Sequence, residues 1–440
     1  MTGLTLFSGA HVIDPANGID AKLDVLVDGP VIANVAAGIA ADDARVVDAT
    51  GLLLLPGFVD LHAHLREPGF EQKGTIETET AAALRGGFTT ICAMPNTDPA
   101  PDDASTVEAL KGRIGRDAHV RVFPIGCITR ERAGVSLAEL SELADAGCVA
   151  FSDDGHPVTS PRLFRNALAI SRSLGIPISE HSDDPALSAG GVAHEGRVSE
   201  RLGLRGYPAA AEINAVARNI ELAEATGARL HLAHLSCARS VALVADAGAR
   251  GLNITSEVTP SHLFLTEDAI AGPEREPAYD TNARINPPLR TEEDRKALLA
   301  GINDGTIDAI ATDHAPHATE DKLCEFDHAA PGISCFETAA ATILTLIDRG
   351  ELDPAAAWAA LTINPVRAFG LQHRVPGLGT LSVGAPADLV LLASSEAWTV
   401  DPARFVSRGR NTPLGGITLT GHVRAVMASG KLWEMEANDD

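Results

Sequence analysis

Two histidines separated by one residue, His62 and His64, are the first residues in this sequence whose spacing suggests chemistry. Alternate residues of a β-strand share one face, so an extended segment would point both imidazoles to the same side. Two nitrogen ligands placed in this way suit a single metal ion. A pair of buried histidines bonded to the backbone is the alternative. The flanking segments 59–60 (VD) and 65–69 (LREPG) favour the metal site.

Two adjacent carboxylates, Asp153 and Asp154, follow the apolar run 149–151. Like charges side by side repel, so the pair indicates either a solvated turn or a cation close by. Adjacent residues diverge on a strand, so only one of the two should face a cluster of histidines. The residues alone leave open which one does.

Other histidines follow apolar runs further along the chain. His181 closes the run 176–180, and His234 lies near the end of the segment RLHLAHLSC. His231 lies three residues before His234, so on a strand the two side chains should face opposite ways. We therefore expect His234 in the site, with His231 packed outward in a structural role.

The segment 311–317 (ATDHAPH) adds Asp313, which can bind a metal or act as a general base, and His317, which can contact an anion. Histidines and carboxylates without a cysteine at ligand spacing predict Zn²⁺ or another divalent ion in an open, catalytic site. Arg66 offers a planar fork for a substrate carboxylate. A surface salt bridge to Glu67 or Glu71 is its alternative role.

Eight apolar, strand-like runs must position these residues, with alanine-rich helical segments such as 213–226 and 239–249 between several of them. Strands that alternate with helices predict a parallel sheet, and eight such strands close a (β/α)8 TIM-type barrel. Active sites of such barrels lie at the carboxyl ends of the strands, where the polar residues occur. An open doubly wound sheet is the rival architecture, but the first run lacks a GxGxxG turn. The runs are 57–65, 88–97, 119–129, 148–155, 176–181, 229–237, 252–262 and 307–317.

Short β-prone runs lie at both ends of the chain and predict a small composite β-sandwich from residues 1–55 and 368–440, beside a barrel of residues 56–367. The net charge of the 440 residues is -24, which argues against nucleic-acid or anionic-membrane binding. Six scattered cysteines, no apparent signal peptide and no long apolar run indicate a cytoplasmic protein without a transmembrane helix.

The ordered motifs resemble those of the amidohydrolase superfamily and, more narrowly, of the class I bacterial dihydroorotases. The resemblance covers essentially the whole chain, and HLREPG, MPNT and ATDHAPH together make it specific. It implies a hydrolase of cyclic amides that cyclises N-carbamoyl-L-aspartate to dihydroorotate in pyrimidine biosynthesis, with one or two zinc ions per subunit. The motifs are DLHAHLREPG, AMPNT, FSDDG, SEH, HLAHLS, TPSHL, NPPLR, ATDHAPH, PGIS and GTLSVGAPADLVLL.

The resemblance also implies a role for individual residues. His62, His64 and Asp313 would hold one zinc, His181 and His234 the other, and Asp154 would bridge them where many relatives use a carboxylated lysine. Asp313 would move the proton between water and the ring nitrogen. Cys335 departs from the glycine that relatives often have after PGIS, which could alter the loop 317–335. The substrate would contact His64, Arg66, Asn96, Asn282, His317, Pro331 and Gly332.

Two other functions stay open at this stage. An allantoinase or hydantoinase would share the fold, although Arg66 and Asn96 favour a substrate with a carboxylate. A catalytically silent barrel that supports aspartate transcarbamoylase would be expected to lose metal ligands, which this chain keeps. The sequence leaves open whether the chain forms a homodimer or associates with a transcarbamoylase.

Overall fold

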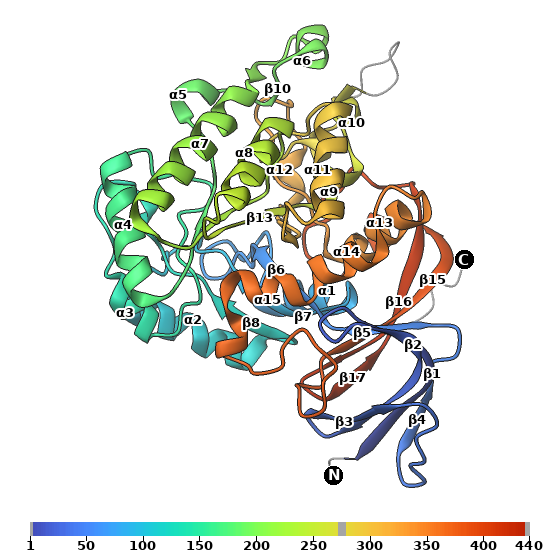
Figure 1. Ribbon diagram of the computed structural model, residues 1–440. Helices are drawn as coiled ribbons and strands as arrows, with labels where there is room; N and C mark the ends of the chain where they lie inside the picture. Colours follow the sequence, from blue (N-terminus) through green and yellow to red (C-terminus); the bar gives the residue numbers. More distant parts are fainter. Residues whose placement is uncertain (1–2, 272–278, 436–440) are drawn as a thin grey trace.

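A ring of parallel strands lies at the centre of the fold (Figure 1). The computed structural model describes residues 3–271 and 279–435, and in this part of the chain eight strand segments make up the ring. One segment pairs only through Phe151. The other seven are β6 (Phe58–Ala63), β7 (Phe88–Ala93), β8 (Arg121–Pro124), β9 (Ile178–Glu180), β12 (Leu230–Leu232), β13 (Ile254–Val258) and β14 (Ala309–Ile310).

The ring consists of two sheets, β6-β7-β8 and β14-β13-β12-β9, joined by parallel bridges. On one side Phe151 pairs with Gly126 and Ile178. On the other side Ala63 pairs with His314, and the His64 amide donates to the His314 carbonyl at 3.0 Å. The predicted barrel is therefore confirmed. An open doubly wound sheet is excluded, because the first and last strands of the ring pair with each other.

A buried carboxylate reinforces the join between β6 and β14. Asp60 on β6 accepts hydrogen bonds from the Thr312 amide at 2.9 Å and from the Thr312 hydroxyl. The same carboxylate accepts from the His62 amide at 3.2 Å. The side chain thus supplies acceptors where the short β14 offers few backbone partners.

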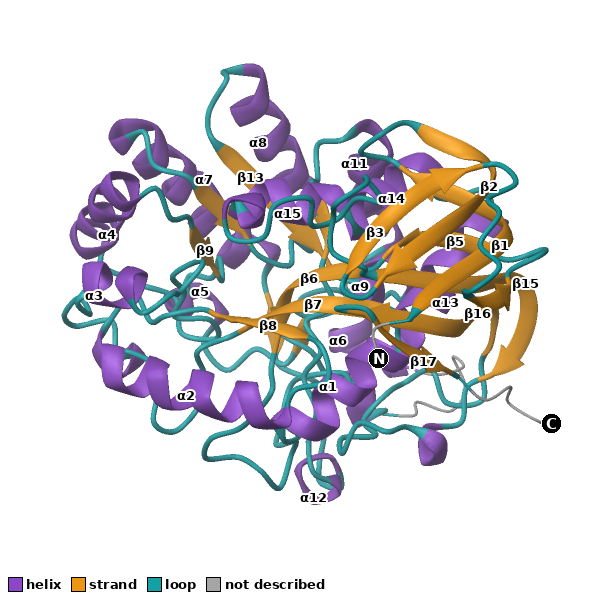
Figure 2. Cartoon of the chain, turned by 90° about the horizontal axis from the view of Figure 1, so that it is seen from below, coloured by secondary structure: helices purple, strands orange, loops and turns teal. Residues whose placement is uncertain are grey.

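Helices cover the outside of the ring (Figures 1 and 2). Four of those that follow the strands start at a side chain that accepts a backbone N–H group, from Thr75, Asp103, Ser160 and Thr291. The two helical segments predicted from the sequence are confirmed as α7 and α8. The helices that follow the strands are α1 (Ile76–Arg85), α2 (Ala104–Asp117), α3 (Leu140–Asp145), α4 (Pro161–Leu174), α7 (Ala209–Thr226), α8 (Ala238–Ala249), α11 (Glu292–Asp304) and α13 (Phe336–Asp348).

Both ends of the chain contribute to one further sheet beside the barrel (Figure 2). β5 joins the two parts, because it pairs with β1 and also antiparallel with β15. The order is β17-β16-β15-β5-β1-β2-β3, with β4 on β1. The strands are β1 (Leu4–Asp14), β2 (Ile19–Asp28), β3 (Val31–Ala36), β4 (Arg45–Asp48), β5 (Leu53–Pro56), β15 (Leu389–Thr399), β16 (Thr418–Ala428) and β17 (Lys431–Glu434).

The sheet encloses its own hydrophobic cluster, to which Phe7 and Val25 contribute from one end of the chain and Leu389 and Met427 from the other. Both ends of the chain thus build one β domain, as expected, and its described strands are connected in a single sheet; that the domain is a sandwich stays a prediction. The proposed boundaries 1–55, 56–367 and 368–440 stay a prediction, and residues 1–2 and 436–440 lie outside the described residues.

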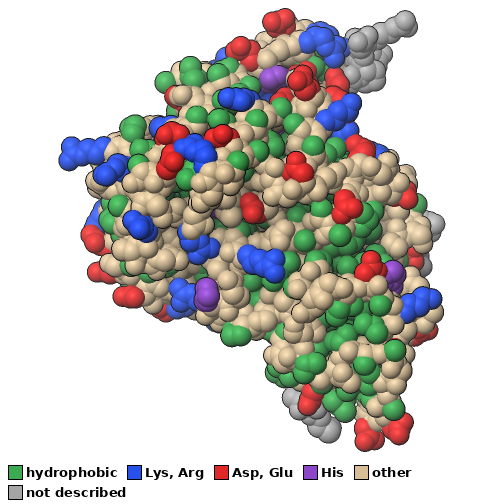
Figure 3. Space-filling model, viewed as in Figure 1, with side chains coloured by type: hydrophobic (Ala, Val, Ile, Leu, Met, Phe, Trp, Pro, Cys, Tyr) green, Lys and Arg blue, Asp and Glu red, His purple; other side chains and the backbone are tan. Residues whose placement is uncertain are grey.

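Two observations bear on what the surface can bind. Acidic and basic side chains are interspersed on the face shown in Figure 3 rather than gathered into a basic patch. Among the described residues, the helices lack the combination of length and apolar character that crossing a membrane requires.

Candidate metal centre and active site

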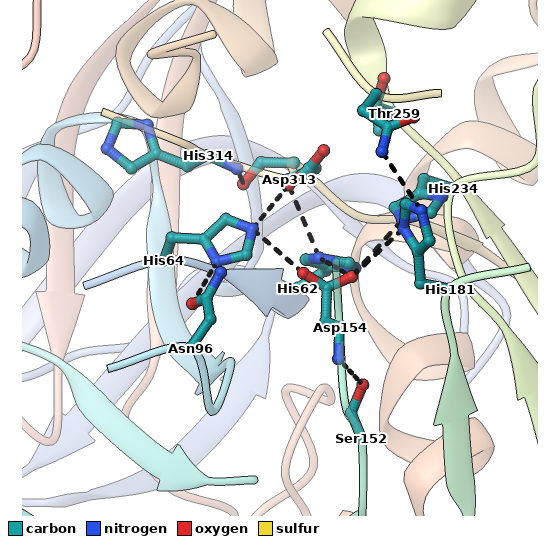
Figure 4. Close-up of polar contacts among 12 residues, drawn as sticks. His62, His64, Asn96, Ser152, Asp154, His181, His234, Thr259, Asp313 and His314 are labelled. Atoms are coloured by element: carbon teal, nitrogen blue, oxygen red, sulfur yellow. Dashed lines mark hydrogen bonds and ion pairs between the residues drawn. The ribbon is translucent and has the colours of Figure 1, made fainter. Parts of the chain in front are cut away.

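The carboxyl ends of the barrel strands bring six polar side chains to one place (Figure 4). Five of them are buried, and Asp313 is largely so. The six lie in or just after the strand segments of the ring. They are His62 of β6, His64 after it, Asp154 after the Phe151 segment, His181 after β9, His234 after β12 and Asp313 after β14.

The first group centres on the two histidines of the HxH motif. The Nε2 atom of His62 lies 3.4 Å from Asp154 Oδ1 and 3.5 Å from Asp313 Oδ1. The Nε2 atom of His64 lies 2.9 Å from Asp313 Oδ1 and 3.6 Å from Asp154 Oδ2. Ligand-type atoms of four residues therefore lie close together between β6, β14 and the end of the Phe151 segment, and those of His62, His64 and Asp154 all lie within 4.8 Å of one another.

The second group shares Asp154 with the first. The Nδ1 atom of His181 and the Nε2 atom of His234 lie 2.8 Å apart, and each is 3.6 Å from Asp154 Oδ1. Asp154 therefore lies between two sets of imidazoles, which is the placement that a bridging carboxylate needs.

The charges of the site fit a cation. Burial alone would raise the pKa of Asp154, but the nearby imidazoles of His62, His181 and His234 hold it well below its ordinary value. The pKa of Asp313 is lowered in the same way by His62 and His64, against the effect of burial. Among the described residues, His62 Nε2 and Asp154 Oδ1 are buried without a hydrogen-bond partner. A divalent ion would satisfy both atoms, so the donor set fits a metal.

The other nitrogens of the first two histidines are held in place. The Nδ1 atom of His62 lies 2.8 Å from Glu257 Oε1, and that of His64 lies 2.8 Å from Asn96 Oδ1. Each contact lets Nδ1–H donate and turns Nε2 toward the two carboxylates, where it can bind a metal, as in many metal sites. Glu257 was not among the predicted site residues. An acidic residue within the apolar run 252–262 was the signal that could have identified it.

The prediction that His231 packs outward is wrong. Its Nε2 atom lies 3.0 Å from Glu257 Oε2, so it shares this carboxylate with His62 inside the barrel. The alternation rule fails because β12 ends at Leu232, and His234 has a φ of 32°, outside extended geometry. Both histidines therefore face inward, at different depths, and His231 keeps a structural role.

Asp153 and Asp154 have different surroundings. Asp153 accepts hydrogen bonds from the Ile128 amide at 2.8 Å, the Thr129 amide at 3.0 Å and the Thr129 hydroxyl. It ties the loop after β8 to the neighbouring strand segment. The structure thus places Asp154 among the histidines and turns Asp153 away from them.

A cavity of about 360 Å³ opens onto five of the six strand-end residues: His64, Asp154, His181, His234 and Asp313. Of the predicted substrate contacts, His64, Arg66, Asn96, His317, Pro331 and Gly332 line it. Asn282 instead lines a neighbouring cavity of about 220 Å³, which also contacts His317. Four further polar residues of the active-site cavity were not predicted: Lys73, Arg132, His156 and Asn286.

Arg66 is buried beside His317 at one wall of the cavity. Its Nε donates to the Pro316 carbonyl at 3.0 Å, and its Nη2 lies 3.3 Å from His317 Nε2. Burial lowers the pKa of Arg66 only to about 10, so the guanidinium stays charged. Burial and the neighbouring Arg66 charge lower the pKa of His317 to about 2, so this imidazole is neutral. The wall therefore carries one cation and one neutral ring.

Cys335 lies at the base of the loop that ends in this wall. It is buried, its Sγ donates to the Thr312 carbonyl at 3.0 Å, and it precedes α13 directly. The side chain thus packs against the barrel, and the effect of Cys335 on loop flexibility stays a prediction.

Comparisons with known proteins agree with this architecture. A dihydro-orotase-like family model matches residues 51–240, and an amidohydrolase family model matches residues 205–433. Two proteins named dihydroorotase are similar over the whole length. The one from Syntrophotalea carbinolica is 45% identical over 97% of this chain and 98% of its own, and the one from Anaeromyxobacter sp. (strain K) is 46% identical over 100% of both.

Solved structures support the fold. An L-hydantoinase (dihydropyrimidinase) from Arthrobacter aurescens has a TM-score of 0.86 at 25% identity, over 98% of this chain and 96% of its own. A dihydropyrimidinase from Brevibacillus agri has a TM-score of 0.84 at 23% identity, over 98% and 94%. The relatives in sequence are closer and share one name, and the chain belongs to the dihydroorotase family of the amidohydrolases.

Proposed function

We propose that this protein is a zinc-dependent dihydroorotase of pyrimidine biosynthesis, which interconverts N-carbamoyl-L-aspartate and (S)-dihydroorotate plus water. One observation carries the proposal. A single cavity combines ionised carboxylates beside His64, His181 and His234 with a buried arginine at its wall, and His62 lies buried behind them. The first set suits hydrolysis of a cyclic amide, and the arginine suits a substrate with a carboxylate that takes no part in the reaction.

The metal would be held by the six strand-end residues. His62, His64 and Asp313 would bind one zinc ion, His181 and His234 a second, and Asp154 would bridge them, which gives one or two ions per subunit. When bound, zinc polarises the amide carbonyl and lowers the pKa of water. Two observations support zinc over metals that prefer soft sulfur ligands. The chain belongs to the amidohydrolases, and the donors are imidazoles and carboxylates without a thiolate among them.

Asp313 would move the proton. Its pKa is held low, so the carboxylate is available as an acceptor at neutral pH. In ring opening it takes the proton of the attacking water and returns it to the ring nitrogen as the carbon–nitrogen bond breaks. In ring closure the ureido nitrogen attacks the side-chain carboxyl carbon, a proton passes through Asp313, and water leaves.

Arg66 would bind the carboxylate of the substrate that does not react. Its fork can form two parallel hydrogen bonds, while Pro316 fixes its Nε. The neutral His317, whose Nε2–H donates to the Pro331 carbonyl at 2.9 Å, and Asn96 face the same cavity. Pro331 and Gly332 would contribute backbone groups. Asn282 would reach the substrate only through the neighbouring cavity, so its role is the least supported of this set.

Ring opening of dihydroorotate, hydantoin and allantoin by the purified protein tests the proposal, with zinc measured in the same sample. We expect turnover of dihydroorotate, its loss after treatment with a chelator and its return on addition of zinc. Asp313→Ala should abolish turnover, whereas Asp304→Ala, an exposed residue at the end of α11, should not. Activity on allantoin alone would indicate a different hydrolase, and a metal-free protein without turnover would indicate a silent partner of aspartate transcarbamoylase.

Partners and location are part of the same proposal. We place the enzyme in the cytoplasm, acting on a small molecule and binding neither nucleic acid nor membranes. A homodimer and an association with aspartate transcarbamoylase stay predictions, which sedimentation of the chain alone and with a transcarbamoylase would test.

A further inference from the structure

A segment of the β domain returns to the active-site wall. The connection between β15 and β16 leaves the sheet, and residues 407–411 of it contact the barrel. Asn411, the last residue of this 407–411 segment, is 4% exposed; it lines the neighbouring cavity of about 220 Å³ but not the cavity that holds the metal groups and Arg66. Any influence on the reaction must therefore pass through the residues that it contacts.

The Asn411 amide uses its whole hydrogen-bonding capacity. Its Oδ1 accepts from the His317 amide and from the Ser334 hydroxyl, both at 2.9 Å. Its Nδ2 donates to the Ala315 carbonyl at 3.0 Å and to the Gly332 carbonyl at 2.9 Å. Two acceptor and two donor contacts fix the amide in one orientation. The side chain thus connects the segment after β14 to the loop that carries Gly332.

Gly409 allows the same segment to pack closely against the barrel. A Cβ atom at Gly409 would lie 2.5 Å from Pro316 Cβ and 2.7 Å from the His317 nitrogen, so no larger residue fits without movement. The carbonyl of Pro316 is the group that accepts from Arg66 Nε. Close packing at Gly409 therefore acts on the residue that holds the arginine.

Ser407 and Arg408, at the start of the segment, contact the barrel at a second place, on α1. The Ser407 hydroxyl and the Arg408 amide both donate to the buried Glu79 of α1, at 2.6 and 3.1 Å. Glu79 Oε2 also lies 2.7 Å from the Nε2 atom of His314, the residue after Asp313. The 407–411 segment is thus bonded on both sides of the turn that holds Asp313 and His317.

We infer that Asn411 is a positioning residue, which fixes the spacing between His317 and Gly332 and through it the wall that binds the substrate carboxylate. The inference rests on the proposed function, because it takes that wall to be the carboxylate site. A displacement of about 1 Å can lower activity by up to about 100-fold, so four hydrogen bonds at this wall are enough to matter.

Asn411→Asp is the sharpest test because it keeps the shape of the side chain. It replaces the two N–H donors with an oxygen that faces the carbonyls of Ala315 and Gly332 and repels them. We expect KM for dihydroorotate to rise about 10- to 100-fold with a smaller fall in kcat, at unchanged zinc content. Asn303→Asp is the control, since Asn303 has a similar pair of backbone contacts, to Glu351 and Asp353, away from the site.

Hydrogen exchange of residues 315–334 supplies a readout that needs no activity. Exchange of these amides should speed up in Asn411→Asp and not in the control. An unchanged KM together with unchanged exchange would overturn the inference, whether or not kcat falls. If the parent protein opens no ring, the proposed function fails while exchange still tests the positioning role. Ser334→Ala removes one of the four bonds and serves if Asn411→Asp does not fold, with a smaller rise in KM expected.

Discussion

Replacing Asp153 and Asp154 one at a time should separate a role in folding from a role in metal binding. Asp153 accepts three hydrogen bonds from buried donors of Ile128 and Thr129. Each donor left unpaired costs about 1–2 kcal/mol, so Asp153→Ala should lower the free energy of unfolding by about 3–6 kcal/mol. Asp153→Asn keeps an acceptor oxygen for the amides, and its cost should be about 1–2 kcal/mol.

Asp154 presents the opposite case. Its Oδ1 has no hydrogen-bond partner among the described residues, but it lies within 3.6 Å of nitrogens of His62, His181 and His234. Asp154→Asn removes the charge that both ligand groups share, so metal binding should weaken by at least about 100-fold. In the presence of a chelator the stability should change by no more than about 1 kcal/mol.

Two measurements on the same preparations decide the matter: zinc per chain after gel filtration, and urea unfolding in the presence of a chelator. Asp145→Ala, at an exposed residue that ends α3, is the control for both. If Asp153→Ala lost its zinc and kept its stability, while Asp154→Asn did the reverse, the assignment of the two carboxylates would be wrong.

Three further changes test two other parts of the site and one buried carboxyl group outside it, Glu337 in the first turn of α13. Glu257→Gln should weaken zinc binding about 10- to 100-fold, because His62 loses its charged partner; zinc competition with a chelator measures this, and an unchanged affinity would contradict it. Arg66→Lys should raise KM at least about 10-fold with little change in kcat, since a lysine cannot form the paired hydrogen bonds; an unchanged KM in steady-state kinetics would remove the carboxylate role. Burial raises the pKa of Glu337 to about 7, above its ordinary 4.5, so its ionisation costs stability as pH rises between these values. In urea unfolding, the free energy of unfolding of Glu337→Gln relative to that of the parent should therefore rise by about 2 kcal/mol from pH 5.5 to pH 8. The same pH dependence in both proteins would refute this.

The barrel could be predicted from the sequence because the same pattern, an apolar run that ends in polar residues, is repeated along the chain. Eight apolar runs each become a strand segment, and the polar residues at their ends meet because parallel strands end at the same side. His62 and His64 illustrate the strength of this rule. Their rings lie 5.3 Å apart and share Asp154 and Asp313, as spacing on a strand suggests.

The remaining parts depend on contacts that no local pattern records. Glu257 is a carboxylate inside a strand, where the sequence does not show that it faces two histidines. Asn411 lies 94 positions after His317, in a connection of the other domain, and only folding brings them together. Positive φ angles at His234 and Asp313 end the strand alternation, so side-chain direction beyond the strand could not be extrapolated.

A metal ion at this centre would also affect how the barrel closes between β6 and β14. Backbone pairing there is sparse and is reinforced by Asp60 and Thr312. An ion bound by His64 on one side and Asp313 on the other would cross-link the first and last strands of the ring. Ions that bind only the folded state stabilise it, so loss of such an ion and opening of the barrel would be thermodynamically linked. Chelation should therefore lower resistance to unfolding of the whole barrel, and exchange should increase first in β6 and β14.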